Sequence, residues 1–356
     1  MCKSAVTSLD ACTPTSTAAC EICFNEAVYG VPGYLRDALD LDPDGDWVDV
    51  PRTAVVRPDN GTLAHPPAII YSPGHGGEAW SESAGHAALS TQWPEAVVIY
   101  LEASRLVDHD GQWRAASSPQ LGDPDWSPRF PHFEAASDHT DLAYLEQVLD
   151  EAQSLFSYDE QRLYATGHSS GGFFTLSLME FMPERFRAFA MLGAYADYGR
   201  DGYGDTPVVV ARGKSPQARP VLSIMGLCDA TFPWSPGAST CGSPFPAPAD
   251  RVHETVRQLT ARAGAFVPGQ DDRAYLDQLV AGAQSGGMGS TSFAPAKTHG
   301  RAVDIRVYPG GHSWPAVADF WVVDYFRSHD QALSSGPDPI FERGWAVPAL
   351  MSAVMP

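Results

Sequence analysis

Positively charged residues are scarce in this chain of 356 residues, and lysine is nearly absent. There are 23 Lys and Arg residues against 43 Asp and Glu, which gives a formal net charge of −20 at pH 7; the lysines are Lys3, Lys214 and Lys297. Proteins that bind nucleic acid neutralise its phosphates with clustered cations. The composition therefore argues against nucleic acid as a partner, and solubility or adaptation to salt explains the acidity.

Long apolar runs are missing as well. No stretch of about 18 consecutive apolar residues occurs, so the sequence predicts no transmembrane segment. The hydrophobic fraction is still 44%, and aromatic residues make up 11% of the chain, which is typical of a globular protein. A chain of this length can bury one large core or two modest ones, and we expect a monomer.

Cysteines are few and unevenly placed. Cys2, Cys12, Cys20 and Cys23 crowd the first 23 residues, and Cys228 and Cys241 stand together much later. An even number of cysteines in an acidic, proline-rich chain indicates disulfides and an oxidising compartment. We therefore expect a secreted or extracytoplasmic protein in which Cys228 pairs with Cys241. The pairing of the first four is open: Cys20-x-x-Cys23 also allows a zinc knot, and a lipid on Cys2 would tether the protein to the cell surface.

Continuous apolar runs alternate with helix-like segments along the chain. Such runs predict strands buried on both faces of a parallel sheet, and an amphipathic pattern predicts a helix at 138–156. The alternation implies right-handed crossovers and an α/β fold, with one doubly wound, mostly parallel sheet and helices on both faces. The predicted strands lie at 47–50, 53–56, 68–71, 96–101, 162–166, 186–192, 220–226 and 303–308.

These elements place the main domain at 46–330. A cysteine-rich extension at 1–45 precedes it, and a C-terminal tail at 331–356 packs on it. Residues 241–299 resemble an insertion within the domain, which is either a lid over the site or a set of peripheral helices.

The pentapeptide Gly167-His168-Ser169-Ser170-Gly171 matches the pattern G-x-S-x-G. A strand-like run at 162–166 precedes it, and a helix-like run at 172–182 follows and stops before Pro183. Strand, sharp turn and helix form a nucleophile elbow, which lifts a serine hydroxyl out of a sheet. The flanking glycines are needed because a side chain there would clash with the turn. The alternative is a glycine-rich turn with an idle serine.

Two further strands end in residues that would complete a catalytic triad with Ser169. Asp229 follows the strand at 220–226, and His312 follows the strand at 303–308. The chain order Ser, Asp, His is that of α/β-hydrolases, in which the histidine takes the serine proton and the carboxylate orients the histidine. We therefore predict these three catalytic residues. A loop carboxylate or helix cap is the alternative for Asp229, and a structural loop histidine is the alternative for His312.

Binding residues are predicted around this triad. The backbone N–H groups of Ser170 and of His75, in the glycine-rich loop at 73–77, are the expected oxyanion donors, although that loop could be a purely structural turn. Trp234 and Trp314 lie close to Asp229 and His312 in the sequence and are expected to line the acyl pocket. This chemistry requires no metal and no cofactor.

Three blocks of the chain resemble the polyhydroxybutyrate depolymerase and feruloyl esterase-like family: 164–172 around Ser169, 226–234 around Asp229, and the more specific Gly310-Gly311-His312-Ser313-Trp314-Pro315. The resemblance covers about 47–325. It implies a secreted α/β-hydrolase that cleaves esters in polymers, with Ser169 as nucleophile, Asp229 orienting and His312 as base.

The chain departs from the family pattern at two points. Pro73-Gly74 stands where the family has His-Gly, and Trp234 replaces a tyrosine. The substrate stays open among polyhydroxyalkanoates, aromatic polyesters, and feruloyl or acetyl polysaccharides. A serine peptidase with the same triad and a non-catalytic binding protein on a hydrolase scaffold are the alternatives.

Overall fold

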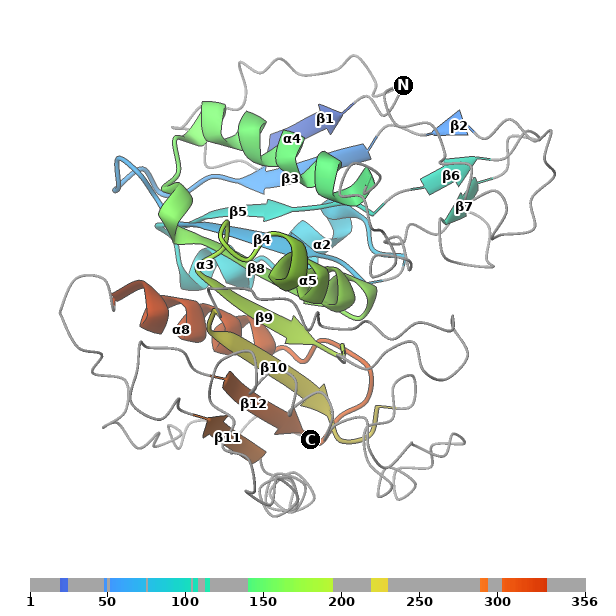
Figure 1. Ribbon diagram of the computed structural model, residues 1–356, viewed down its shortest axis with the longest axis vertical. Helices are drawn as coiled ribbons and strands as arrows, with labels where there is room; N and C mark the ends of the chain where they lie inside the picture. Colours follow the sequence, from blue (N-terminus) through green and yellow to red (C-terminus); the bar gives the residue numbers. More distant parts are fainter. Residues whose placement is uncertain are drawn as a thin grey trace.

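A nine-stranded sheet runs through the centre of the protein (Figure 1). The computed structural model describes residues 20–24, 48–49, 52–74, 76–103, 105–107, 113–115, 140–194, 219–229, 289–293 and 303–331. The strand order is β1-β3-β5-β4-β8-β9-β10-β12-β11. The strands are β1 (Cys20–Phe24), β3 (Arg52–Arg57), β4 (Ala68–Ser72), β5 (Val97–Tyr100), β8 (Leu163–His168), β9 (Ala188–Leu192), β10 (Val221–Gly226), β11 (Gly289–Phe293) and β12 (Val303–Tyr308).

Six neighbouring strands, from β5 to β12 in that order, pair in parallel. The antiparallel pairs lie at the two edges, where β3 and β1 follow β5 and where β11 follows β12. The predicted mostly parallel sheet is therefore confirmed. The parallel strands all end at the same edge of the sheet, which is where doubly wound sheets build their sites.

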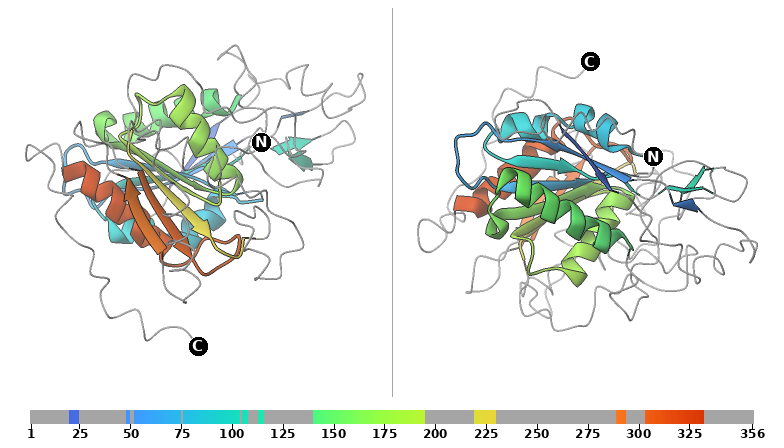
Figure 2. Two further views of the ribbon diagram at one scale, coloured as in Figure 1. Left: turned by 60° about the horizontal axis from the view of Figure 1, so that its bottom comes forward. Right: turned by 90° about the horizontal axis from the view of Figure 1, so that it is seen from above.

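Helices cover both faces of the sheet, as predicted (Figure 2). Apolar side chains of α4 (Thr140–Phe156) and α5 (Ser170–Phe181) belong to one core cluster, and those of α2 (Ala79–Gly85), α3 (Ala88–Gln92) and α8 (Ala318–Gln331) belong to another. Adjacent strand residues divide between the clusters: Ile70 joins the first, and Ile69 and Tyr71 join the second. This division follows from the two-residue period of a strand, and it explains why the predicted runs were continuously apolar.

Both outer strands come from segments that the sequence analysis set apart from the sheet. β1 lies within the predicted extension and pairs antiparallel with β3, and β11 lies within the predicted insertion and pairs antiparallel with β12. A small separate sheet contains β2 (Val48–Asp49), β6 (Arg105–Val107) and β7 (Trp113–Ala115), and a short 3₁₀ helix, η5 (Glu160–Arg162), precedes β8. The tail beyond residue 331 lies outside the described residues.

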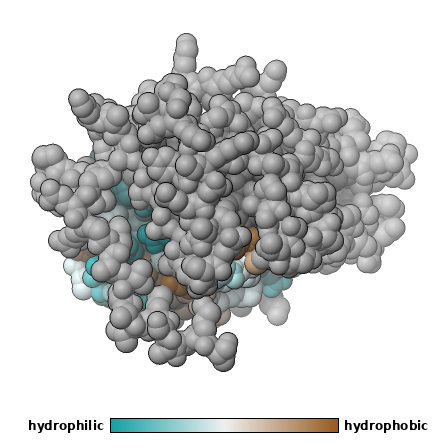
Figure 3. Space-filling view, turned by 90° about the horizontal axis from the view of Figure 1, so that it is seen from below, coloured by the Kyte–Doolittle hydropathy of each residue, from teal (hydrophilic) through white to brown (hydrophobic). Residues whose placement is uncertain are grey.

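The described surface shows few large apolar side chains. Those that are exposed are Leu63, Trp80 and Phe320. On the face drawn in Figure 3, the described residues in view are a mixture of hydrophilic and hydrophobic ones, with no broad apolar patch among them. Within the described part of the chain, no helix combines the length and the hydrophobicity that crossing a bilayer requires.

Candidate active site

Ser169 occupies the sharp turn between β8 and α5. Its backbone adopts φ 54° and ψ −121°, and Ser157 is the other non-glycine residue with a positive φ in the described part of the chain. Such a conformation costs on the order of 1–3 kcal/mol and persists where the surroundings hold it. Here the Ser169 N–H donates to the carbonyl of Leu192, at the end of β9 (2.9 Å), and the Ser169 carbonyl accepts from Phe173 (3.0 Å). The elbow is thus held by the next strand and by its own helix.

The glycines of the elbow allow α5 to approach the sheet closely. A Cβ on Gly171 would lie 2.0 Å from the carbonyl oxygen of Ser72, at the end of β4, and a Cβ on Gly167 would lie 2.3 Å from the carbonyl oxygen of Gly171. Both contacts are with backbone atoms, which cannot turn aside as a side chain can. The predicted requirement for glycine at these positions follows from this crowding.

The three predicted triad residues converge at the carboxyl edge of the sheet. Nε2 of His312 lies 2.7 Å from Oγ of Ser169, and Nδ1 of His312 lies 2.7 Å from Oδ2 of Asp229. The Asp229 side chain is 1% exposed, whereas that of His312 is 14% exposed. The carboxylate is therefore shielded while the imidazole remains accessible. This arrangement satisfies the geometry of a nucleophile, a base and an orienting acid.

Backbone hydrogen bonds join the two loops that carry Asp229 and His312. After β10, the Leu227 N–H donates to Tyr308 (2.8 Å) and the Cys228 N–H donates to Gly310 (2.7 Å). The Tyr308 hydroxyl lies 2.6 Å from the carbonyl oxygen of Gly311, just before His312. Asp229 and His312 consequently lie on two loops that are hydrogen-bonded to each other.

His168 packs against His312. Its ring centroid lies 5.1 Å from that of His312 and 6.1 Å from that of Trp314. Burial, with a further contribution from the positive charge that His312 can carry, lowers the pKa of His168 to about 3. Its buried Nε2 has no protein hydrogen-bond partner. His168 is therefore a neutral ring against which His312 rests at physiological pH.

The predicted oxyanion donors are only partly described. Ser170 is the first residue of α5 and follows the nucleophile directly, so its N–H lies at the helix N-terminus, where backbone N–H groups lack intrahelical partners. The glycine-rich loop passes close by, since a Cβ on Gly74 would lie 3.3 Å from Cβ of Ser169. His75, the second predicted donor, lies outside the described residues.

Trp314 packs beside the elbow, since its ring centroid lies 6.1 Å from that of His168. Its ring lies 5.3 Å from Tyr71 and 5.0 Å from His86, and its indole N–H donates to Asp319 (2.8 Å). These contacts anchor a partly buried ring. Its predicted part in the acyl pocket stays a prediction. Trp234 and Cys241 lie outside the described residues.

The residues that the sequence analysis missed are Tyr308, His86 and Asp319. Tyr308 hydrogen-bonds to the His312 loop locally, through the carbonyl oxygen of Gly311. Asp319 binds Trp314 of that loop, and His86 reaches Asp319 from a segment 233 residues away. Among the residues that the structure describes, no group of three or more His, Cys, Asp or Glu side chains is arranged to hold a metal ion.

Comparison with known proteins gives a family model that matches the elbow region and two curated relatives that match part of the chain. The model of the Prolyl oligopeptidase family matches residues 137–208. "Putative esterase NocK" of Nocardia uniformis subsp. tsuyamanensis is 31% identical over 183 residues, covering 49% of this chain and 48% of that protein. "Poly(3-hydroxyoctanoate) depolymerase" of Pseudomonas fluorescens is 34% identical over 134 residues, covering 36% of this chain and 45% of that protein. The fold is that of an α/β-hydrolase.

Each match spans about half of the curated relative's length. Among solved structures, an S-formylglutathione hydrolase from Agrobacterium tumefaciens is 12% identical with a TM-score of 0.48, covering 81% of this chain and 94% of that one. The α/β-hydrolase assignment accords with the parallel strand order and with the elbow that follows β8.

Proposed function

We propose that this protein is a serine ester hydrolase that acts through an acyl-enzyme on Ser169. The observation that carries the proposal is the row of hydrogen-bonding atoms from Oγ of Ser169 through His312 to Oδ2 of Asp229, with 2.7 Å at each step. Ser169, Asp229 and His312 follow three different strands of one sheet, β8, β10 and β12. Homology to proteins named as an esterase and a depolymerase supports the same reaction class.

The reaction would run in two halves. Nε2 of His312 takes the proton of the Ser169 hydroxyl while Oγ bonds to the ester carbonyl carbon, and the resulting imidazolium then protonates the departing alcohol. Water, deprotonated by the same nitrogen, then attacks the acyl carbon; the bond from this carbon to Oγ of Ser169 breaks, the imidazolium returns the proton to Oγ, and the acid leaves. Throughout, Asp229 accepts from the Nδ1–H of His312, which leaves Nε2 free to receive the serine proton.

The negative charge that develops on the carbonyl oxygen needs donors. We assign the N–H of Ser170 as one, because it follows the nucleophile and lies at the N-terminus of α5. The second is the N–H of His75, whose neighbour Gly74 lies beside Ser169. Removing a single oxyanion donor from a hydrolase typically costs about 10²–10³-fold in kcat.

We propose an ester within a polymer as the substrate. The resemblance of the three sequence blocks and the name of the relative from Pseudomonas fluorescens support a polyester; feruloyl and acetyl polysaccharides are the other candidates. Trp234 and Trp314 would line the acyl side. The oxidising compartment inferred from the cysteines supports a secreted or surface-tethered monomer, in which a disulfide between Cys228 and Cys241 braces the Asp229 loop.

The peptidase alternative has a specific observation behind it, because the family model that matches 137–208 is that of the Prolyl oligopeptidase family. That segment contains the elbow, which esterases and peptidases share. A p-nitrophenyl ester and a p-nitroanilide of the same acyl group separate the two activities. We expect the ester to be cleaved at least about 10²-fold faster in kcat/KM, and faster cleavage of the anilide would reject the esterase assignment.

Substitution of the nucleophile tests the mechanism itself. We expect Ser169→Ala to lower kcat on p-nitrophenyl butyrate by at least about 10³-fold with little loss of folding. The variant should also resist labelling by a fluorophosphonate. Turnover similar to that of the wild-type protein would refute the nucleophile. Release of soluble products from films of polyhydroxybutyrate and poly(3-hydroxyoctanoate), compared with a feruloyl ester, then identifies the substrate class.

A further inference from the structure

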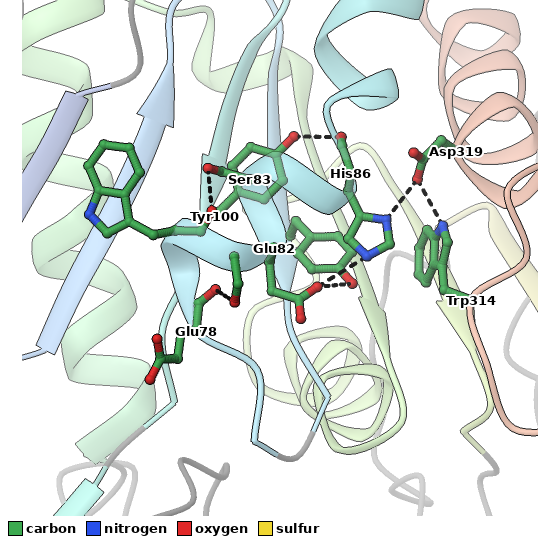
Figure 4. Close-up of polar contacts among 10 residues, drawn as sticks. Glu78, Glu82, Ser83, His86, Tyr100, Trp314 and Asp319 are labelled. Carbon is green, nitrogen blue, oxygen red and sulfur yellow. Dashed lines mark hydrogen bonds and ion pairs between the residues drawn. The ribbon is translucent and has the colours of Figure 1, made fainter.

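A mostly buried polar cluster lies on the face of the sheet covered by α2 and α8 (Figure 4), and it approaches the triad through the contact between Trp314 and His168. We call it the His86 cluster. It joins β4, α2, the His312 loop and α8, which are far apart in the sequence. Its members are Tyr71, Glu82, His86, Trp314 and Asp319.

His86 lies between two carboxylates. Its Nε2 is 3.1 Å from Oε2 of Glu82, and its Nδ1 is 3.3 Å from Oδ1 of Asp319. Because both ring nitrogens face acceptors, the ring satisfies both only when each nitrogen carries a proton. Burial alone would lower the pKa of His86, but hydrogen bonds to Asp319 and Glu82 outweigh it and raise the pKa to about 9. Figure 4 shows the imidazole pointing toward both acids.

Asp319 connects His86 to the loop that carries His312. The oxygen that faces His86, Oδ1, also accepts the indole N–H of Trp314 at 2.8 Å. Trp314 is two residues beyond His312, and its ring touches His168, on which the His312 ring rests. His86 is thus linked to His312 through Oδ1 of Asp319, the indole of Trp314 and the ring of His168.

Removing the imidazolium would disturb this link. The buried carboxylate of Asp319 and the partly buried carboxylate of Glu82 would then lack the cation that compensates both. Carboxylates in that situation move toward water or take up protons. Either change alters the oxygen that accepts from Trp314. A displacement of about 1 Å at a reacting group costs up to about 10²-fold in rate, because His312 must stay within hydrogen-bonding reach of Ser169.

We propose that His86 is a positioning residue for the reaction: by holding Asp319 against the indole N–H of Trp314, it fixes the loop that presents Nε2 of His312 to Ser169. The proposal rests on the proposed function, in which His312 is the base. His86 touches neither the substrate nor the reacting atoms. Its effect should therefore appear in the rate of the chemical step and not in the binding of the ester.

The test is a double-mutant cycle on the full chain with p-nitrophenyl butyrate, using His86→Gln, Trp314→Phe and the two combined. His86→Gln removes the cation, and Trp314→Phe keeps an aromatic ring but removes the N–H. We expect each single variant to lower kcat by about 10- to 100-fold with KM within about twofold. Because both act through Asp319, the double variant should lose no more than about threefold beyond the worse single variant.

Asp330→Asn is the matched control. Asp330 lies in the last turn of the same helix, α8, and forms a half-buried ion pair with Arg162 at 2.6 Å. Arg162 precedes β8 and Ser169 follows it, so this ion pair and the triad lie at opposite ends of that strand. We expect this variant to lose stability but to keep kcat within about twofold of the wild type. Circular dichroism and thermal melts verify folding, and Trp314→Phe keeps the test informative if His86→Gln does not fold.

Three results would overturn the inference: kcat of both single variants within twofold of the wild type, a rise in KM at unchanged kcat, or losses in kcat that multiply in the double variant. Ser169→Ala, measured in parallel, distinguishes failure of the proposed function from failure of the positioning role. If Ser169→Ala stays active, the proposed function itself fails. If it is inactive while the His86 and Trp314 variants turn over normally, only the positioning role fails.

Discussion

Replacement of Asp229 by Asn gives the sharpest test of the triad. The carboxylate is buried and accepts from Nδ1 of His312 at 2.7 Å. An amide of the same shape can turn its NH₂ toward Nδ1, and the ring then carries its proton on Nε2. In that tautomer Nε2 cannot accept the proton of Ser169, although the nucleophile, the elbow and the substrate site are unchanged.

The expected size of this effect is large. A wrong tautomer in a Ser-His-Asp triad lowers kcat by about 10⁴-fold. At about 1.36 kcal/mol for each factor of ten, this corresponds to about 5 kcal/mol of lost transition-state stabilisation. We expect Asp229→Asn to lose about 10³- to 10⁴-fold in kcat on p-nitrophenyl butyrate, with KM within about threefold.

The assay compares steady-state kinetics of Asp229→Asn, the wild type and Asp330→Asn, which removes an acid from a different half-buried ion pair. Thermal melts confirm that the variants are folded at the assay temperature. A folded Asp229→Asn protein with kcat within tenfold of the wild type would refute the orienting role of this carboxylate.

Two further predictions concern stability and covalent structure. The pKa of His168 is lowered from 6.5 to about 3 in the folded state. The neutral form of His168 therefore contributes stability that is present above about pH 6.5. This stability is lost as the pH falls, and the free energy of unfolding decreases by up to about 1.4 kcal/mol per pH unit. Urea unfolding between pH 6.5 and 4.5 should show a shallower loss for His168→Gln, and equal slopes would contradict the assignment. Digestion without reduction should yield a peptide pair linking Cys228 to Cys241, and free-thiol labelling of either residue in the unreduced protein would exclude the pairing.

The elbow and the parallel sheet could be predicted because their signals are local. Five consecutive residues specify the turn at Ser169, and runs such as Ala68–Ser72 are apolar throughout because both of their faces are buried. Asp229 and His312 were found because each follows a readable strand, and parallel strands bring their carboxyl ends to one edge.

The helix α8 was missed although its pattern is readable. Ala318, Trp321, Val322, Tyr325 and Phe326 are buried on one side of it, with the spacing of an amphipathic helix. The edge strands β1 and β11 gave weaker signals, because neither CEICF nor GSTSF is a continuous apolar run like those of the central strands.

The His86 cluster could not be predicted from the sequence. His86 and Asp319 are 233 residues apart, and neither lies in a recognisable motif. Their contact depends on how α8 packs beside α2 and α3 on one face of the sheet. Only the assembled fold brings these charges together.

Residues at both ends of the helix α8 contact residues at or next to the ends of the strand β8. Near its start, Asp319 binds Trp314, which touches His168 at the end of β8; in its last turn, Asp330 binds Arg162 and Tyr164 at the beginning of β8. From Asp319 to Asp330 the helix rises about 17 Å, and β8 from Leu163 to His168 extends about 17 Å as well. The two elements are therefore matched in length, and a single-residue insertion or deletion between the anchors of α8 would also turn one anchor by about 100° about the helix axis. Evolution can vary the surface of this helix freely, but it cannot easily vary the number of residues in it.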